Sequence, residues 1–326
     1  MLFRSVTESM TAFPSPIIHR KCLQKVLLIQ PPAFSNNMRT DMNPNAPLGL
    51  AYIAGILERE KYDVQILDAF IEGWEHESRI SEDKILVGLS FEQIKKIIAD
   101  VNPDVVGVTS MFTSQRKNAH QIAKIVKEVD REIVVIFGGA HPTSAFESVL
   151  DDSCVDIAVL GEGDNLIVPL IRSIEKGNDI RKLDGIAYRD ENGNAVKIQK
   201  VTQINDLDEL PFPARHLLPM EKYFAAGVRH GGLGKGQRAA SMITSRGCQF
   251  LCNFCTAFQV FTRKPRMRSI ENVLAEIDEL KDKYKIDEIF FEDDQIIAKQ
   301  RRAGDLFDAI GERYDLLWDT PNGVSP

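Results

Sequence analysis

The sequence lacks the features that would place it in a membrane or in an oxidising compartment. No stretch approaches the roughly 18–20 uncharged apolar residues that a membrane helix needs, and the first residues have no apolar core of the signal-peptide type. The 5 cysteines are an odd number, which suits a disulfide framework poorly. We therefore expect a cytoplasmic protein whose thiols stay reduced and which has no membrane span.

The sequence also has too few basic residues for a protein that binds nucleic acids by bulk electrostatics. Its 40 Lys and Arg are outnumbered by 47 Asp and Glu, so the formal charge is −7. Two nucleotide-binding motifs are missing: neither G-x-G-x-x-G between a strand and a helix nor G-x-x-x-x-G-K-[ST] occurs. We therefore expect no nucleic-acid partner, and a dinucleotide site has no support.

The length and composition are those of a globular protein with two domains. The chain has 326 residues, of which 44% are hydrophobic and 27% charged, whereas one compact domain usually holds about 100–200 residues. The Asn192–Gly193 pair between two alternating runs predicts a β-hairpin. The expected divisions are a loose leader (1–24), an α/β domain (25–180), a hairpin and linker (181–238) and a second domain (239–326).

Short apolar runs alternate with helical patterns along the first domain. The expected strands cover residues 25–30, 63–67, 104–109, 133–137 and 156–160. Because these runs are almost continuously apolar, they are typical of parallel strands with both faces covered. Right-handed crossovers then predict a doubly wound, Rossmann-like parallel sheet. The charged segment 74–84 is expected to be a surface insertion after the second strand.

Turn-forming and hydroxyl residues gather where these strands end. Doubly wound sheets bind ligands at the carboxyl ends of their strands, so these residues are candidates for a ligand site. Glycines at such places also serve simply to make tight turns, and that alternative holds for any one of them. Four such loops at one edge nevertheless favour a bound ligand. The candidate residues are Pro31, Pro32, Thr109, Ser110, Gly138, Gly139, Gly161, Glu162 and Gly163.

Three of the cysteines, Cys248, Cys252 and Cys255, lie close together directly after an expected strand. The spacing C-x-x-x-C-x-x-C lets three thiolates in one loop converge on a metal centre and leaves one coordination position open. A closed zinc site would need a fourth ligand, and the nearest candidates, His216 and His230, form no partner pair. An iron–sulfur cube with one iron that the protein does not ligate fits better. Coincidental core cysteines are the third alternative.

Residues 244–255, with the sequence TSRGCQFLCNFC, resemble the cluster loop of the radical SAM superfamily and, within it, of the cobalamin-binding-domain subgroup. Gln249 departs from the subgroup pattern, in which a proline is frequent. Residues 286–294 resemble the second barrel strand with its acidic end. The first domain resembles the B12-binding module at residues 138–143, GGAHPT, and 161–164, GEGD. The resemblance covers nearly all of the chain beyond the leader.

This resemblance implies the cofactors of the second domain. Cys248, Cys252 and Cys255 would ligate a [4Fe–4S] cluster, and its open iron would chelate S-adenosyl-L-methionine (SAM). Glu292 or Asp293 would contact the methionyl amine of SAM. Acidic residues at this place are also typical of a helix N-terminus, and the two roles are compatible.

For the first domain the resemblance implies a bound cobalamin. The loops at the carboxyl edge of the sheet, together with His141 and Pro142, would line its pocket. His141 could equally be a structural residue, because it stands alone. No D-x-H-x-x-G motif occurs, so the resemblance implies a corrinoid without a histidine as lower ligand.

The second domain resembles the N-terminal part of a (β/α) barrel of the TIM type. Residues 239–326 accommodate two strand–helix repeats and the start of a third strand, fewer than the resemblance implies for a whole barrel. So short a segment cannot bury a full barrel. We therefore expect an incomplete catalytic domain, in a chain that binds corrinoid well and SAM poorly.

The resemblance implies a B12-dependent radical SAM enzyme. In such enzymes the cluster cleaves SAM to give a 5′-deoxyadenosyl radical, and methylcobalamin methylates an unactivated carbon. It also implies an unknown small-molecule substrate and an electron donor such as flavodoxin or ferredoxin. Two alternatives to a methyltransferase stay open. One is a cyclase or rearrangement enzyme without methyl transfer, and the other is a non-catalytic corrinoid-binding or sensor protein.

Overall fold

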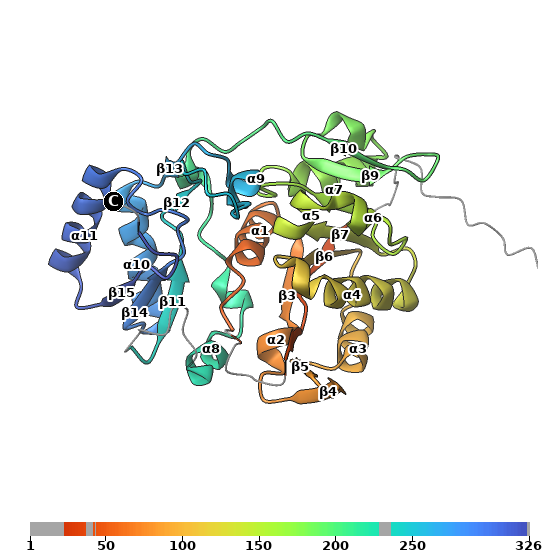
Figure 1. Ribbon diagram of the computed structural model, residues 1–326, viewed down its shortest axis with the longest axis horizontal. Helices are drawn as coiled ribbons and strands as arrows, with labels where there is room; N and C mark the ends of the chain where they lie inside the picture. The colour runs from red at the N-terminus through yellow and green to blue at the C-terminus, as the bar shows by residue number, and fades with distance from the viewer. Residues whose placement is uncertain (1–22, 37–41, 43, 228–235, 325–326) are drawn as a thin grey trace, which may run out of the picture.

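The computed structural model describes residues 23–36, 42, 44–227 and 236–324, which form two α/β units (Figure 1). The larger unit contains a seven-stranded sheet, and the smaller unit contains a three-stranded parallel sheet with two long helices. Most of the expected leader and His230 lie outside the described residues. Within those residues, no helix is both long and apolar enough to cross a bilayer.

Five parallel strands form the body of the large sheet. They are β1 (Lys25–Gln30), β3 (Asp63–Asp68), β6 (Val105–Thr109), β7 (Val134–Gly138) and β8 (Ile157–Val159). Every pairing between them is parallel, in the order β3-β1-β6-β7-β8, which confirms the predicted doubly wound sheet. The order of the strands reverses between β1 and β6. In such a fold, ligands bind outside the carboxyl ends of the strands at this point.

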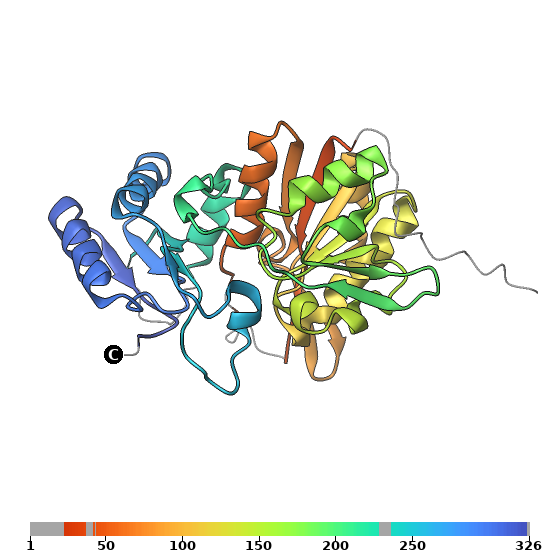
Figure 2. The same cartoon turned by 90° about the horizontal axis from the view of Figure 1, so that it is seen from above.

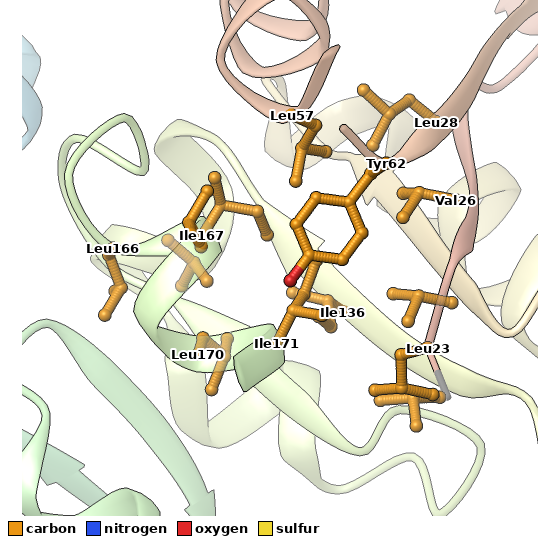
Figure 3. Packing of buried hydrophobic residues seen from close by; sticks show 14 of the residues in the cluster. Leu23, Val26, Leu28, Leu57, Tyr62, Ile136, Leu166, Ile167, Leu170 and Ile171 are labelled. Carbon is orange, nitrogen blue, oxygen red and sulfur yellow. The ribbon is translucent and has the colours of Figure 1, made fainter. Parts of the chain in front are cut away.

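Helices cover both faces of this sheet because successive side chains of a strand point to opposite faces. They are α1 (Leu48–Arg59) and α7 (Ile167–Lys176) on one face, and α3 (Phe91–Val101), α4 (Arg116–Val129) and α6 (Phe146–Leu150) on the other. In β1, Val26 and Leu28 belong to the core under α1 and α7, whereas Leu27 and Ile29 belong to the opposite core. Figure 3 shows the first of these cores.

The predicted hairpin forms, but it belongs to the large sheet rather than to the linker. Its strands are β9 (Ile186–Arg189) and β10 (Ala195–Ile198), and β9 pairs antiparallel with β8. Ile186, Ala187 and Tyr188 are buried in the two cores of the larger unit. Because these side chains complete the two cores, the antiparallel hairpin extends the sheet beyond its five parallel strands.

The charged segment 74–84, expected as a surface insertion, is exposed from residue 75 on and includes a strand that the sequence does not predict. It contains β4 (Glu77–Ser81), which pairs with β5 (Lys84–Val87), and β5 also pairs with β2 (Ala33–Ser35) in a small antiparallel sheet. All residues of β4 are exposed, so no apolar pattern marks it as a strand. It is a strand because it pairs with β5, whose apolar residues are buried in the larger unit.

Four further short α-helices lie within the described residues. They are α2 (Ala69–Glu72), α5 (Ala140–Ser144), α8 (Met220–Ala226) and α9 (Ala257–Phe261). Helix α2 follows β3 and α5 follows β7, so both begin at the carboxyl edge of the large sheet. Helix α8 lies in the linker, and α9 follows the cysteines.

The smaller unit has two strand–helix repeats and a third strand, as the sequence predicts. Its elements are the parallel strands β11 (Ala239–Met242), β14 (Glu288–Phe291) and β15 (Leu317–Asp319) and the helices α10 (Ile270–Tyr284) and α11 (Gln300–Arg313). A two-residue ladder joins β12 (Ser245–Arg246) to β13 (Arg266–Met267). Ser269 caps α10 by accepting a hydrogen bond from the Asn272 amide. This alternation of parallel strands and helices is that found in (β/α) barrels.

A buried acid joins the larger unit to the linker helix α8. Asp68 ends β3, and its Oδ1 accepts hydrogen bonds from the amides of Phe70 and Ile71 at 3.0 and 3.1 Å. Its Oδ2 accepts a hydrogen bond from the Tyr223 hydroxyl at 2.5 Å, and both side chains are buried. Burial raises the pKa of Asp68 to about 6, although these hydrogen bonds act in the opposite direction. Burial also raises the pKa of Tyr223, so its hydroxyl keeps its proton.

We expect Asp68→Asn to change how stability depends on pH. Asp68 has a higher pKa in the folded state, so its stabilising contribution is present below an unfolded pKa of about 4 and is lost as the pH rises through about 6. The free energy of unfolding of the variant relative to the parent should therefore rise by up to about 3 kcal/mol between about pH 4 and pH 7. Urea unfolding at a series of pH values measures this difference.

The control is Asp100→Asn, which changes an exposed carboxyl group on α3. Its difference from the parent over the same pH range is the baseline for the comparison. A difference for Asp68→Asn that changes with pH no more than this baseline would contradict the raised pKa.

Candidate functional site

The loops after β1, β6 and β7 meet at the carboxyl edge of the large sheet. The Asn118 side chain on α4 donates a hydrogen bond to the Pro32 carbonyl at 2.7 Å and so holds the loop after β1. The Ser110 amide donates to the Gly138 carbonyl at 2.8 Å, and the His141 amide donates to the Ser110 carbonyl at 3.0 Å. These contacts bring together residues from three of the four candidate loops.

The turn between β7 and α5 requires glycine at Gly139. Its φ of 111° lies in the left-handed region, and a Cβ there would lie 2.9 Å from the Ser110 carbonyl oxygen. A Cβ on Gly138, in contrast, would meet nothing within 4 Å. Gly139 therefore lets two loops touch, while Gly138 borders open space.

Besides Oδ1 of Asn118, two buried polar atoms at this edge have no partner in the part of the chain that the structure describes. They are Nε2 of His141 and Oγ of Ser110. The other ring nitrogen of His141, Nδ1, lies 3.1 Å from Thr113 Oγ1. Burial lowers the pKa of His141, so its ring is neutral near pH 7. Buried polar atoms without partners cost stability, and these two are therefore suited to a bound molecule that presents polar groups.

Thr143, which is not among the residues expected from the sequence, joins the loop after β8 to the loop after β7. The Thr143 hydroxyl donates a hydrogen bond to the Gly139 carbonyl at 2.8 Å and accepts one from the Gly161 amide at 3.0 Å. Its one signal in the sequence is its place in the GGAHPT segment. The remaining candidates of this edge are Pro31 after β1, Thr109 at the end of β6 and the buried Pro142 in α5.

In the loop after β8, the side chain of Glu162 points toward the smaller unit. Glu162, a candidate ligand contact, is buried, and its carboxylate accepts hydrogen bonds from Arg266 at 2.8 Å and from Arg246 at 3.2 Å. Gly163 packs close to α1, since a Cβ there would lie 3.3 Å from Ile53. The structure therefore places the Glu162 carboxylate against arginines of the smaller unit.

The three cysteines lie in the loop between β12 and β13. At the start of this loop, Gly247 has a φ of 93°, and a Cβ there would lie 2.8 Å from the Lys264 carbonyl oxygen. The two ends of the loop are therefore in contact. The Cys255 amide donates a hydrogen bond to the Cys252 carbonyl at 3.2 Å. All three thiols are free, with Cys252 exposed and Cys248 and Cys255 half-buried.

Among the described residues, no three His, Cys, Asp or Glu side chains lie close enough together to hold one metal ion. A single zinc would need its thiolate ligands within about 2.3 Å of one point. A four-iron cube binds each thiolate through a different iron and so accepts sulfurs that are further apart. Of the histidines considered for zinc, His216 pairs with Glu58 at 2.9 Å. The three free thiols of this loop supply the three thiolates that a cube with one open iron needs.

Exposed apolar side chains accompany both candidate sites. Met111 and Phe112 follow β6, and Leu251 and Phe254 lie in the cysteine loop. Single exposed apolar residues are ordinary, but several on loops around a site are typical of a surface that binds an apolar molecule or another part of a protein. These side chains can therefore line a site from which water is excluded.

The acids after β14 differ in their surroundings. Asp293 is buried, and it accepts hydrogen bonds from the amide and hydroxyl of Thr244 and from the hydroxyl of Ser245. Burial raises the pKa of Asp293, and these hydrogen bonds lower it. Glu292 is half-buried and accepts a hydrogen bond from the Ser241 hydroxyl at 3.1 Å. Both predicted acids therefore already have partners, that of Glu292 within β11 and those of Asp293 in the segment that follows it.

The third acid, Asp294, is not singled out by the sequence analysis. Its Oδ2 is buried and finds no hydrogen-bond partner within the described ranges. Burial raises the pKa of Asp294, while a hydrogen bond from the Gly247 amide lowers it. This bond places the carboxylate beside the start of the cysteine loop.

A second buried ionic group stabilises the base of the smaller unit. Glu276 of α10 forms an ion pair with Arg215 of the linker, at 2.6 Å, and its other carboxylate oxygen accepts a hydrogen bond from Arg268. Tyr52 of α1 lies near these groups; burial, followed by the charge of Glu276, raises its pKa to about 12. The sequence carries no signal for this group, because Glu276 is one of several acids in a charged helix.

Residues 39–171 match the model of the B12 binding domain family. The chain is 35% identical to cytidylyl-2-hydroxyethylphosphonate methyltransferase of Streptomyces wedmorensis, over 93% of this chain and 60% of that protein. It is 29% identical to anaerobic magnesium-protoporphyrin IX monomethyl ester cyclase of Rubrivivax gelatinosus, over 83% of this chain and 46% of that protein.

A solved structure shares the fold. It is that of the cobalamin-dependent S-adenosylmethionine radical enzyme OxsB with aqua-cobalamin and S-adenosylmethionine bound. The TM-score is 0.70 at 19% identity, over 91% of this chain and 38% of that chain. The chain spans less than two thirds of the length of each of these three proteins. In its B12-binding domain match, its homologues and its fold, the chain is similar to cobalamin-dependent radical SAM enzymes.

Proposed function

We propose that the protein takes part in a B12-dependent radical SAM reaction that methylates an unactivated carbon of a small molecule. Its larger unit would bind cobalamin. Cys248, Cys252 and Cys255 would hold a [4Fe–4S] cluster to which SAM binds. The 35% identity to a methyltransferase supports methyl transfer.

The contact between the two candidate sites carries this proposal. Helix α9, which closely follows Cys255, rests on α5, which follows the Gly138–Gly139 turn (Figure 2). The Ser144 hydroxyl at the end of α5 donates a hydrogen bond to Gln259 Oε1 of α9 at 2.8 Å. A methyl donor at the edge of one unit and a radical source in the adjacent loop would therefore face the same space.

The cobalamin site would use the loops at the carboxyl edge of the large sheet. Gly138 borders open space, and Gly139 allows two of the loops to touch. Ser110 Oγ and His141 Nε2 would hydrogen bond to polar groups of the corrinoid, since both atoms are buried and have no partner among the described residues. The contact of His141 Nδ1 with Thr113 orients the ring for that role.

Asp294 is the acid best suited to meet the amine of SAM. Its Oδ2 is buried near the cysteine loop, and burial raises its pKa. A neighbouring ammonium group would offset this desolvation by charge pairing. The sequence candidates Glu292 and Asp293 would support the turn that carries this acid, because their carboxylates are engaged with Ser241, Thr244 and Ser245.

When bound, the cluster and SAM supply a 5′-deoxyadenosyl radical, and methylcobalamin supplies a methyl group. The protein itself binds these groups, orients them and excludes water from the space between them. The exposed Met111 and Phe112 of one unit, with Leu251 and Phe254 of the other, suit the exclusion of water.

The proposed reaction needs two conditions from its surroundings. An electron donor such as flavodoxin or ferredoxin must reduce the cluster before SAM is cleaved. The three thiolates must stay reduced, which supports a cytoplasmic setting.

Anaerobic reconstitution tests the cofactor assignment. The chain is treated with iron and sulfide, hydroxocobalamin and then SAM are added, and UV–visible and EPR spectra are recorded at each step. We expect bound corrinoid and the EPR signal of a reduced four-iron cluster, which should change when SAM is added. Folded protein that binds neither cofactor would contradict the proposal.

Replacing a cysteine of the loop should prevent cluster assembly. Cys248→Ala removes one of three thiolate ligands, so reconstituted protein should contain little iron and sulfide and lack the four-iron EPR signal. Cys154→Ala is the control, because Cys154 lies in the larger unit beside a core. Full iron content in Cys248→Ala would show that this thiol is not a ligand.

Ser110→Ala should separate corrinoid binding from folding. The buried hydroxyl has no partner among the described residues, so its removal should leave the free energy of unfolding unchanged or slightly higher. If the hydroxyl binds the corrinoid, the dissociation constant of hydroxocobalamin should rise by about 3- to 10-fold. Absorbance titration measures this constant. Ser148→Ala, on the exposed side of α6, is the control, and equal constants for both variants would exclude the contact.

A cyclisation or rearrangement without methyl transfer is the second candidate. The 29% identity to a cyclase supports it, but this identity is lower than that to the methyltransferase. SAM with a deuterated methyl group distinguishes the two reactions by mass spectrometry. A product that carries the label supports methyl transfer, and an unlabelled product supports cyclisation or rearrangement.

A further inference from the structure

Two carboxylates in the loop after β8, in the larger, B12-binding unit, contact arginines of the smaller unit. The side chains of Glu162 and Asp164 are 2% and 8% exposed, and those of their partners Arg246 and Arg266 are 5% and 3% exposed. Charges so far from water are stable only when they are paired and hydrogen bonded. None of these four side chains is a proposed contact of cobalamin or SAM.

Each arginine meets a carboxylate through two parallel hydrogen bonds. Arg266 donates from both terminal nitrogens to the two oxygens of Glu162, each at 2.8 Å. Arg246 donates in the same way to Asp164 at 2.9 and 3.0 Å, and it donates a third bond to Glu162 at 3.2 Å. Burial lowers the pKa of Arg246, but the carboxylates of Asp164 and Glu162 raise it by more. Pairs of this kind define the orientation of a side chain as well as its position.

These arginines stand at the two ends of the cysteine loop. Arg246 in β12 is paired with Arg266 in β13, and Gly247 and Cys248 follow Arg246 directly. Gly247 has no room for a Cβ, which would crowd three backbone oxygens across the loop. The Cys248 amide donates a hydrogen bond to the Thr262 carbonyl at 3.3 Å. A displacement of Arg246 would therefore displace Cys248.

The same arginines also hold the end of α9. Arg266 donates to the Phe261 carbonyl at 3.1 Å and to the Ile204 carbonyl of the linker at 2.6 Å. The Arg246 guanidinium lies 5.5 Å from the centre of the Phe261 ring and 5.1 Å from that of the Tyr52 ring. The guanidinium groups thus connect both carboxylates to the base of the cysteine loop and to its helix.

We propose that Glu162 and Asp164 are positioning residues for the cluster rather than contacts of the corrinoid. Through Arg266 and Arg246 they hold the base of the cysteine loop against the B12-binding unit. The inference rests on the proposed function, because it assumes that the loop carries a cluster. It adds a role for the B12-binding unit, which sets the surroundings of the cluster in the neighbouring unit.

Glu162→Gln tests this role, with Glu147→Gln on the exposed side of α6 as the matched control. In reconstituted protein we expect the variant to release iron to a chelator about tenfold faster than the control, because a buried arginine loses its charged partner. The EPR signal of its reduced cluster should broaden. The dissociation constant of hydroxocobalamin should stay within about twofold of the parent value, because the Glu162 carboxylate faces Arg266 of the smaller unit. Glu162→Asp, which keeps the charge, should behave more like the parent.

Two results would overturn the proposal. Iron release and EPR signals that match those of Glu147→Gln would show that Glu162 does not position the cluster. A roughly tenfold weaker binding of hydroxocobalamin with an unchanged cluster would make Glu162 a corrinoid contact instead. If Glu162→Gln does not fold, Asp164→Asn gives the same test through Arg246.

Hydrogen exchange in iron-free protein separates this proposal from the proposed function. Faster exchange confined to residues 246–268 in Glu162→Gln would show that the carboxylates hold the loop even before a cluster is present. Unchanged exchange there would contradict the inference. A parent protein that forms no four-iron cluster would refute the proposed function, while the exchange result would still decide whether Glu162 and Asp164 hold this loop.

Discussion

Buried charge at the junction of the two units constrains the arrangement of everything around it. Removing one partner of a buried ion pair costs about 3–5 kcal/mol, since the other charge is left without compensation. The pairs of Glu162 with Arg266 and of Asp164 with Arg246 join segments that are far apart in the sequence. The large sheet, the linker and the barrel strands must therefore adopt one mutual arrangement before any of these charges can be buried at an acceptable cost.

The contacts with the smaller unit gather at one edge of the parallel sheet. All five parallel strands end on the same side, so their loops share the space where ligands of such folds bind. Helix α5 carries His141 near one end and Ser144 at the other, so one short helix takes part in both the candidate corrinoid site and the contact with α9. The loop after β8 divides its roles similarly: Gly161 binds Thr143, and Glu162 faces the other unit.

The sequence predicts the elements better than the directions of their side chains. Apolar runs and glycine-rich turns suffice to predict the doubly wound sheet, because both patterns follow from burial. The barrel, in contrast, is expected from the family resemblance of the cysteine loop. The exposed strand β4 has no such pattern, since its structure depends on pairing with β5. Glu162 is expected at the ligand edge because its place in a loop is visible in the sequence, whereas its partner Arg266 is brought near only by folding. The unpartnered oxygen of Asp294 is likewise invisible until its neighbours are placed.

The two tryptophans are divided between the two units. Trp74 packs edge-on against Phe70 in the larger unit, with ring centres 5.4 Å apart. Trp318 of β15 stacks on Phe307 of α11 in the smaller unit, at 4.4 Å and nearly parallel. Each unit therefore carries its own fluorescent probe in a distinct aromatic environment. Replacing either tryptophan with phenylalanine would leave emission from one unit alone, so that the unfolding of the sheet and of the barrel strands could be followed separately in the same molecule.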